Sequence, residues 1–246
     1  MTSMTVTAAQ ARATPPWRQV ARQVLIALLQ RASWFWGGAV VIVCGVLFTI
    51  SRFNEMSLSG MQFVHQAAPW FQFAMAISVV AVYLPVYVAA GTTRLSFVRG
   101  AMIAAAATSV GYSIILATLL LIEGQIYGAL GWFHGGDDAP SATVLASGLW
   151  PYVAGTILIF TAGTISGLLV GAAYYRCGAS RGTLALPLTL APLLLVSMLA
   201  RTSVNQWSPL GSSTGAGGWW QPLIGVALLI VAGLAFHLLV RRVPIR

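Results

Sequence analysis

Hydrophobic residues along this chain gather into six long apolar runs, with the polar residues between them. A transmembrane helix needs about 20 apolar residues, because each residue rises about 1.5 Å and the hydrocarbon core is about 30 Å thick. The runs are therefore predicted to be six transmembrane helices, which makes the chain an all-α membrane protein. Their predicted bounds are residues 34–51, 70–90, 101–122, 151–175, 184–200 and 220–240.

The segment before the first run has a different pattern. Across residues 15–33, apolar residues recur at i, i+3 and i+4 spacing, and arginines and glutamines occupy the other face. This pattern favours an amphipathic helix in the membrane interface, with its arginines toward lipid headgroups. The alternative is that the segment extends the first transmembrane helix as one long helix. Residues 1–14 are polar, so we expect a disordered tail, and residues 34–246 form the transmembrane domain.

Composition and charge support the same class. The 246 residues are 58% hydrophobic and only 7% charged, whereas soluble domains are about 25% charged. All 13 basic residues are arginines, and the formal net charge is +9. Because the arginines lie in short segments at the ends of apolar runs, they are typical of residues that set membrane topology. We expect no nucleic-acid partner.

The charge bias between the two sides predicts the orientation. With a cytoplasmic N-terminus, eleven of the 13 arginines lie inside, all except Arg52 and Arg201, and all four acidic residues lie outside. Cytoplasmic loops of membrane proteins carry the excess of positive charge. We therefore expect a multi-pass protein of the cell membrane with both termini in the cytoplasm.

Small residues and prolines mark particular predicted helices. Gly163, Gly167 and Gly171 repeat every four residues in the fourth helix. This spacing predicts a groove in which another helix approaches closely. Prolines interrupt the second and fifth helices, where we expect kinks. They are Pro85, Pro187 and Pro192.

The connection between the second and third helices, residues 91–100, carries more functional groups than a turn requires. Two glycines bracket two arginines, an aromatic residue and hydroxyl groups. Leu95 and Val98 lie three residues apart, as one face of a short helical turn needs. We expect this connection to contact another protein on the cytoplasmic side. Its candidate contact residues are Gly91, Thr93, Arg94, Leu95, Phe97, Val98, Arg99 and Gly100.

The sequence argues against energy coupling or metal chemistry within this chain. A phosphate-binding loop ends in Lys-Ser or Lys-Thr, and the chain has no lysine. The ionisable residues that an ion-coupled carrier needs occur only near helix ends, at His65, Glu123 and His237. The two cysteines, Cys44 and Cys177, fit neither a disulfide nor a metal site. We expect no metal, no cofactor and no nucleotide hydrolysis in this chain.

A serine and a histidine raise one enzymatic alternative. Ser166 and His237 resemble the serine and histidine of a rhomboid-type intramembrane protease, in which a nucleophilic serine needs a base within hydrogen-bond reach. Thr164 stands where that motif has its first glycine. The interpretation as a helix-packing glycine ladder with an interfacial histidine is therefore favoured.

Glu123 has two interpretations that the sequence leaves open. Its carboxylate caps the outer end of the third helix in the headgroup region, or it marks the outer mouth of a translocation path. The sequence favours neither.

Residues 91–100 resemble the same region of type-2 permeases of ATP-binding-cassette (ABC) transporters, especially the short six-span actinobacterial type. Those permeases often have a Gly-x-[Ser/Thr]-Arg-x-x-Phe-x-x-Gly pattern there. Leu95 stands where a second basic residue often follows, and both Glu123 and residues 167–182 extend the similarity. The matching residues are Gly91, Thr93, Arg94, Phe97 and Gly100.

The resemblance implies the transmembrane permease subunit of an ABC exporter, forming the path for an amphipathic or hydrophobic substrate. Two copies of a separate ATPase subunit, with ATP and Mg, would drive it. A second permease copy, identical or related, would complete the path. Residues 91–100 would be the coupling helix, with Phe97 in an apolar pocket of the ATPase and Arg94 paired with a carboxylate. The alternatives are a non-transporting membrane sensor or scaffold, and the protease.

Overall fold

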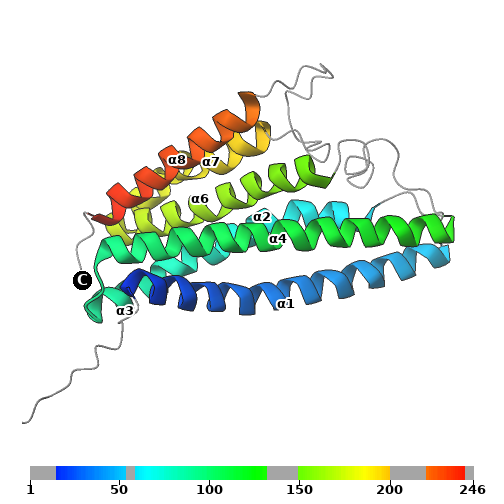
Figure 1. Ribbon diagram of the computed structural model, residues 1–246, viewed down its shortest axis with the longest axis horizontal. Helices are drawn as coiled ribbons and strands as arrows, with labels where there is room; N and C mark the ends of the chain where they lie inside the picture. Colours follow the sequence, from blue (N-terminus) through cyan, green and yellow to red (C-terminus); the bar gives the residue numbers. More distant parts are fainter. Residues whose placement is uncertain (1–14, 54–58, 132–148, 200–219, 242–246) are drawn as a thin grey trace, which may run out of the picture.

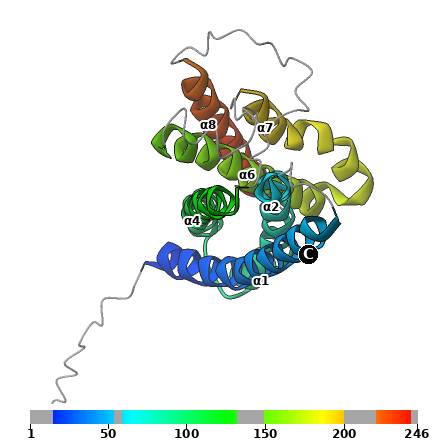
Figure 2. The ribbon, with the colours of Figure 1, turned by 90° about the vertical axis from the view of Figure 1, so that its right-hand side faces the viewer.

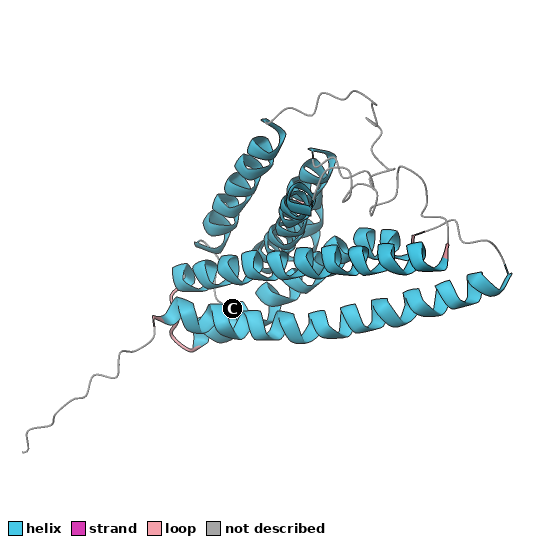
Figure 3. Cartoon of the chain, turned by 45° about the vertical axis from the view of Figure 1, so that its right-hand side comes forward, coloured by secondary structure: helices cyan, strands magenta, loops and turns pink. Residues whose placement is uncertain are grey.

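The computed structural model describes residues 15–53, 59–131, 149–199 and 220–241, which form a helical bundle with no strand among them (Figure 1, Figure 3). The predicted tail of residues 1–14 lies outside the described residues. The helices are α1 (Pro16–Phe53), α2 (Gly60–Ser78), the π-helical turn η1 (Val79–Tyr83), α3 (Leu84–Ala89), α4 (Arg94–Leu130), α6 (Leu149–Leu184), α7 (Leu186–Leu199) and α8 (Trp220–Arg241).

Five of these helical stretches are long and apolar enough to cross a membrane. The fifth predicted helix is the exception, since α7 has 14 residues and rises only about 21 Å. The structure thus confirms the all-α class and the apolar character typical of membrane proteins. The five long stretches in the described part are Pro16–Ile50, Phe63–Ala89, Arg94–Leu130, Tyr152–Leu184 and Pro222–Arg241.

The first helix, α1, is uninterrupted over 38 residues. The predicted boundary between an interfacial helix and a first transmembrane helix is therefore wrong. Val20, Val24 and Leu28 are buried in one apolar core with residues of α4 and α8. The apolar face of the N-terminal segment packs on the bundle rather than on lipid, and this packing keeps it in line with the rest of α1.

The second predicted helix is divided into α2, η1 and α3. It begins at Gly60 rather than at residue 70, and its interruption is the π-helical turn before Pro85. Proline has no N–H group, so Pro85 cannot donate to the carbonyl four residues earlier, and its ring crowds that carbonyl. A π-turn is one way in which a helix absorbs such a disturbance.

The central helix is α6, which packs against α2, α4, α7 and α8 (Figure 2). Its three spaced glycines face α2 and η1. A Cβ atom at Gly163 would lie 2.9 Å from the carbonyl oxygen of Pro69, and one at Gly171 would lie 3.0 Å from that of Ile77. Only glycine allows the two backbones this close, as the spacing predicts.

The end of α6 differs from the prediction. Residues 176–183, predicted to be a loop, form two helical pieces that meet at a break at Gly178, whose φ of 78° suits glycine. The chain then turns directly into α7. The short α6–α7 junction keeps these two helices packed against each other.

Buried polar side chains join the central helices. Gln72 of α2 donates to the carbonyl of Thr108 in α4 at 3.4 Å, and it accepts from the hydroxyl of Thr164 in α6 at 3.2 Å. Ser113 of α4 donates to the carbonyl of Val153 in α6 at 3.0 Å. In an apolar bundle such bonds hold neighbouring helices in register.

Both described ends of the chain lie at the same end of the bundle (Figure 1). At the start of α1, Gln23 accepts a hydrogen bond from Tyr87 of α3. Arg94, at the start of α4, donates to the backbone carbonyl of Arg241 at the end of α8. The start of α1, the α3–α4 turn and the end of α8 are therefore neighbours, and we refer to this end as the basic end.

Candidate functional site

The turn between α3 and α4 is shorter than the predicted contact loop. Gly91, with a φ of 82°, reverses the chain after α3, and the Thr93 hydroxyl accepts from the N–H of Ser96 at 3.2 Å. This bond is an N-cap, and it starts α4 at Arg94. Residues 94–100 thus form the first two turns of a long helix, so the predicted separate coupling helix is corrected.

Part of the predicted contact surface faces inward. Phe97 is 0% exposed, and its ring lies 6.1 Å from that of Tyr87, centroid to centroid. Val98 is also buried. A Cβ at Gly100 would lie 2.7 Å from the Cβ of Val20 in α1. Phe97 is therefore a core residue, and the prediction that it fills a pocket on a partner is corrected.

The outward face of the same turn is formed by four of the five remaining predicted residues, all except the half-buried Arg94. Gly91, Thr93, Leu95 and Arg99 are exposed, and Leu95 has 45% of its surface accessible. Leu95 and Arg99 are four residues apart, so they lie on one face of α4. We call these four residues the turn surface. It combines an apolar side chain with a cation and is held in place by the buried Phe97 behind it.

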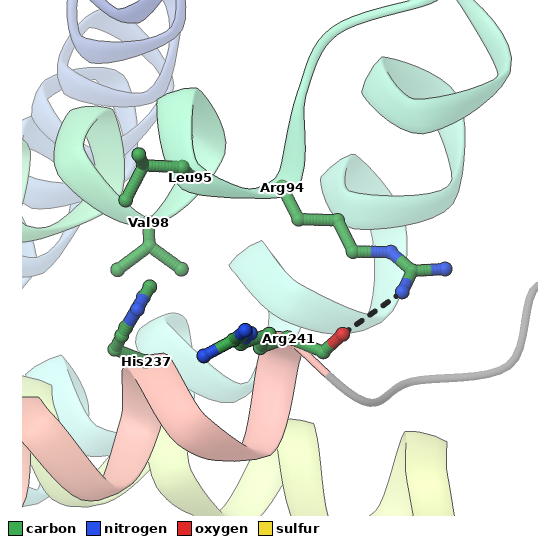
Figure 4. Close-up of a pocket in the computed structure, with 5 residues that line it drawn as sticks. All are labelled: Arg94, Leu95, Val98, His237 and Arg241. Atoms are coloured by element: carbon green, nitrogen blue, oxygen red, sulfur yellow. Dashed lines mark hydrogen bonds between the residues drawn. The ribbon is translucent and has the colours of Figure 1, made fainter.

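A pocket of about 280 Å³ lies between the start of α4 and the end of α8. Arg94 donates to the carbonyl oxygen of Arg241 at 3.0 Å, and this bond ties the two helix ends together. In Figure 4 the side chains of His237 and Arg241 lie opposite Leu95 and Val98, whereas the guanidinium of Arg94 reaches around the end of α8. The lining residues are Arg94, Leu95, Val98, His237 and Arg241.

Sequence reasoning did not predict this pocket. Arg94 and Arg241 are 147 positions apart. The sequence pattern favours a partner contact for Arg94 and a role in membrane topology for Arg241. The only signal in the sequence was that His237 and Arg241 lie one turn apart at the end of an apolar run. That pattern alone does not tell which helix packs beside them.

Glu123 lies at the opposite end of the bundle and has a structural role. Glu123 is only 5% exposed. It accepts hydrogen bonds from the Ser59 hydroxyl at 2.7 Å, the Gly60 N–H at 2.7 Å and the Met61 N–H at 3.2 Å. A carboxylate suits the positive end of a helix. Glu123 therefore caps the start of α2 from α4, rather than the end of its own helix in the headgroup region. The path-mouth interpretation stays a prediction.

The serine and histidine of the protease alternative have separate surroundings. Ser166 is fully buried, and its hydroxyl accepts the N–H of Leu193 in α7 at 3.1 Å. His237 lines the pocket at the basic end. No hydrogen bond joins these two side chains, so the nucleophile–base contact that serine chemistry needs is not formed.

Other ionisable and sulfur-containing side chains do not form a site. His65 is buried beside the ring of Tyr152. Cys44 and Cys177 are exposed and unpaired with each other. Across the described residues, no group of three or more His, Cys, Asp or Glu side chains is placed to hold a metal ion.

Comparisons of the chain with protein-family models, curated proteins and solved structures gave no match. The surfaces described above are therefore what bears on function. The two that stand out are the turn surface and the adjoining basic pocket.

Proposed function

We propose that this chain is the transmembrane permease subunit of an ABC exporter, driven by a separate ATPase. The observation that carries the proposal is the turn surface. It is an exposed apolar and cationic patch at the basic end, and its position is fixed by buried contacts. A patch that docks onto a motor subunit must be accessible to be recognised and rigid to transmit movement.

The contact residues in this proposal are Leu95 and Arg99 of the turn surface. They replace Phe97, which is buried, and Arg94, which is half-buried and donates to the carbonyl of Arg241. Leu95 provides the apolar contact, and Arg99 pairs with a carboxylate on the ATPase. Phe97 acts indirectly, because its burial against Tyr87 fixes the angle at which α4 leaves the turn. Interfaces draw most of their affinity from a few anchors of this kind.

The proposal includes six membrane crossings, with both termini in the cytoplasm of the cell. Both α6 and α8 run toward the basic end (Figure 1), and a Cβ at Gly225, near the start of α8, would lie 3.6 Å from Leu158, near the start of α6. Between them the chain has to return to the far end. We assign that crossing to the fifth predicted helix, residues 184–200, most of which is α7.

In this mechanism ATP and Mg²⁺ belong to two ATPase copies, which bind beneath two permease copies. Movement of the ATPase reaches the bundle through the turn surface. The π-turn η1 is separated from the turn only by the short helix α3, and such irregular turns are common where helices adjust at functional sites. The substrate is amphipathic or hydrophobic, as the apolar character of the helices suggests.

Co-purification with an ATPase encoded by a neighbouring gene tests the proposal. We expect the full-length chain to retain the ATPase. Arg99→Glu should weaken retention about 30-fold, because a hot spot contributes about 2 kcal/mol. Arg22→Glu is the matched control. Arg22 is an exposed arginine of α1, two residues from Val20, which faces Gly100 at the basic end.

Three outcomes would contradict the proposal. The first is the lack of any neighbouring gene for an ATPase with phosphate-loop and signature motifs. The second is equal retention of the ATPase by wild type, Arg99→Glu and Arg22→Glu. The third is a retained ATPase whose hydrolysis of ATP moves no substrate in reconstituted vesicles, which would instead favour the sensor or scaffold.

A further inference from the structure

The pocket at the basic end holds positive charge that no described acidic side chain neutralises. Two of its lining residues are arginines, and His237 adds an imidazole. In the described part of the chain Glu123 is the single acidic residue. It is bonded to Ser59 and to the start of α2, at the opposite end of the bundle. A group of cations without a carboxylate partner is suited to an external anion.

The geometry of the pocket favours a small anionic group. Its volume, about 280 Å³, lies just below the range of about 300–1,000 Å³ that is usual for pockets of drug-sized ligands. The pocket adjoins the N-terminal end of α4, a helix of 37 residues, whose dipole favours negative charge. The start of α4 therefore adds to the attraction that Arg94 and Arg241 exert on an anion in the pocket.

An apolar surface leads along α8 to this pocket. Ile230, Leu234 and Leu238 follow one another at four-residue spacing, and each has more than half of its surface exposed. Arg241, three residues after Leu238, continues the same helix face. An acyl chain lying on these three residues would bring its phosphate to Arg241 and His237, which points to a lipid rather than a soluble anion.

We propose that this pocket binds the phosphate headgroup of an anionic phospholipid, with one acyl chain along α8. His237 and Arg241 contact the phosphate. Arg94 is a positioning residue, which holds the end of α8 through its bond to the Arg241 carbonyl. Basic pockets between membrane helices on the cytoplasmic side are suited to such headgroups. The pocket shares Leu95 with the turn surface, but its phosphate contacts, His237 and Arg241, lie outside that surface. Lipid binding can therefore be measured on this chain without an ATPase.

Native mass spectrometry of the full-length protein in detergent tests this site, with phosphatidylglycerol as the anionic lipid and phosphatidylcholine as the zwitterionic one. We expect phosphatidylglycerol to bind more tightly than phosphatidylcholine. Arg241→Gln should weaken phosphatidylglycerol binding about fivefold, the effect of one arginine near an anionic headgroup. His237→Gln should also weaken it. Arg22→Gln removes an exposed arginine that does not line the pocket. The affinity of this control variant for phosphatidylglycerol should stay within about twofold of wild type.

Circular dichroism shows which variants keep the wild-type helicity and are therefore correctly folded. Only these variants are compared, and one folded variant of Arg241 or His237 is enough for the test. Equal affinity for the two lipids would overturn the proposal. An equal loss of affinity in Arg22→Gln and Arg241→Gln would also overturn it, because the lipid would then be held only by the overall positive charge of the protein surface. Competition by inorganic phosphate at the concentration of the lipid would assign the pocket to a free phosphate instead and would overturn the lipid site.

Discussion

Glu123 is a single side chain that joins two helices at the far end of the bundle. Its carboxylate accepts one hydroxyl and two backbone N–H groups around the start of α2, although it belongs to α4. A buried charge is costly unless it is hydrogen-bonded, and here three donors and the helix dipole offset that cost. The residue therefore stabilises the α2–α4 contact.

Replacement of Glu123 tests this role. Glu123→Ala leaves three buried donors without their acceptor, so the free energy of unfolding should fall by about 2–3 kcal/mol. Glu123→Gln keeps an acceptor oxygen and should lose less. The measurement is tryptophan fluorescence during denaturation in detergent. Thr118→Ala, an exposed change in the same helix, is the control. If the Glu123→Ala protein were as stable as wild type but showed altered transport, the capping role would be contradicted and the path-mouth interpretation supported.

Phe97 is a residue type that is typical of interfaces, but here it belongs to the core. Aromatic residues are common anchors at interfaces, and the sequence places Phe97 between two exposed positions, Leu95 and Arg99. One helical turn separates these two, and Phe97 points away from both of them. Leu95 and Arg99 thus belong to the exposed face of α4, and Phe97 belongs to the core behind it.

Among the elements, α6 determines how closely the bundle packs. At Gly163 and Gly171 an added Cβ would meet backbone carbonyl oxygens of α2 at 2.9 and 3.0 Å. Backbone atoms cannot turn aside as a flexible side chain can. A larger residue at these positions must push the two helices apart, which would also disturb the nearby bond between Gln72 and Thr164.

A pair of glycine substitutions measures this effect. Gly163→Ala should lower the free energy of unfolding by about 1–3 kcal/mol, the usual cost of overpacking. Gly111→Ala in α4 is the matched control. Its added Cβ has no neighbour within 4 Å, so helix propensity should make the protein more stable by up to about 1 kcal/mol. Equal stability changes in the two variants would mean that α6 and α2 are less closely packed than described.

At the scale of the whole molecule, the basic end brings together the start of α1, the α3–α4 turn and the end of α8. The proposed six crossings follow from the directions of α6 and α8. Both helices run toward the basic end, so the chain has to return to the far end between them. The arginine bias predicts that the basic end faces the cytoplasm. Docking of a motor subunit and binding of an anionic headgroup both require that orientation.

Cysteine labelling in intact cells tests the orientation, after Cys44 and Cys177, both exposed, are replaced by alanine. Ser180→Cys should be reached only from the cytoplasm. Ser141→Cys and Ser208→Cys, at positions outside the described residues, should be labelled from the external side. External labelling at Ser208 would support the fifth predicted helix, residues 184–200, as a crossing. Cytoplasmic labelling at Ser208 would reduce the number of crossings, and labelling of Ser141→Cys from the cytoplasm would reverse the topology.

Much of this architecture could be predicted from local sequence. Hydropathy over about 20 residues depends only on neighbours in the chain, so the apolar runs correspond to helices and the class follows. The four-residue spacing of Gly163, Gly167 and Gly171 likewise predicts a close helix contact. An interruption before Pro85 follows from the missing N–H of proline. Each of these properties belongs to one segment and needs no knowledge of its partner.

Tertiary structure decided what depends on partners distant in the chain. Whether Phe97 faces a partner or the core depends on the rotation of α4 about its axis, which its packing against α1 and α3 determines. Glu123 meets the start of α2 more than 60 positions away, and Arg94 meets Arg241 at 147 positions. The same hydropathy pattern is compatible with many such pairings. Only the close packing of complementary helix surfaces selects one, and with it the basic pocket.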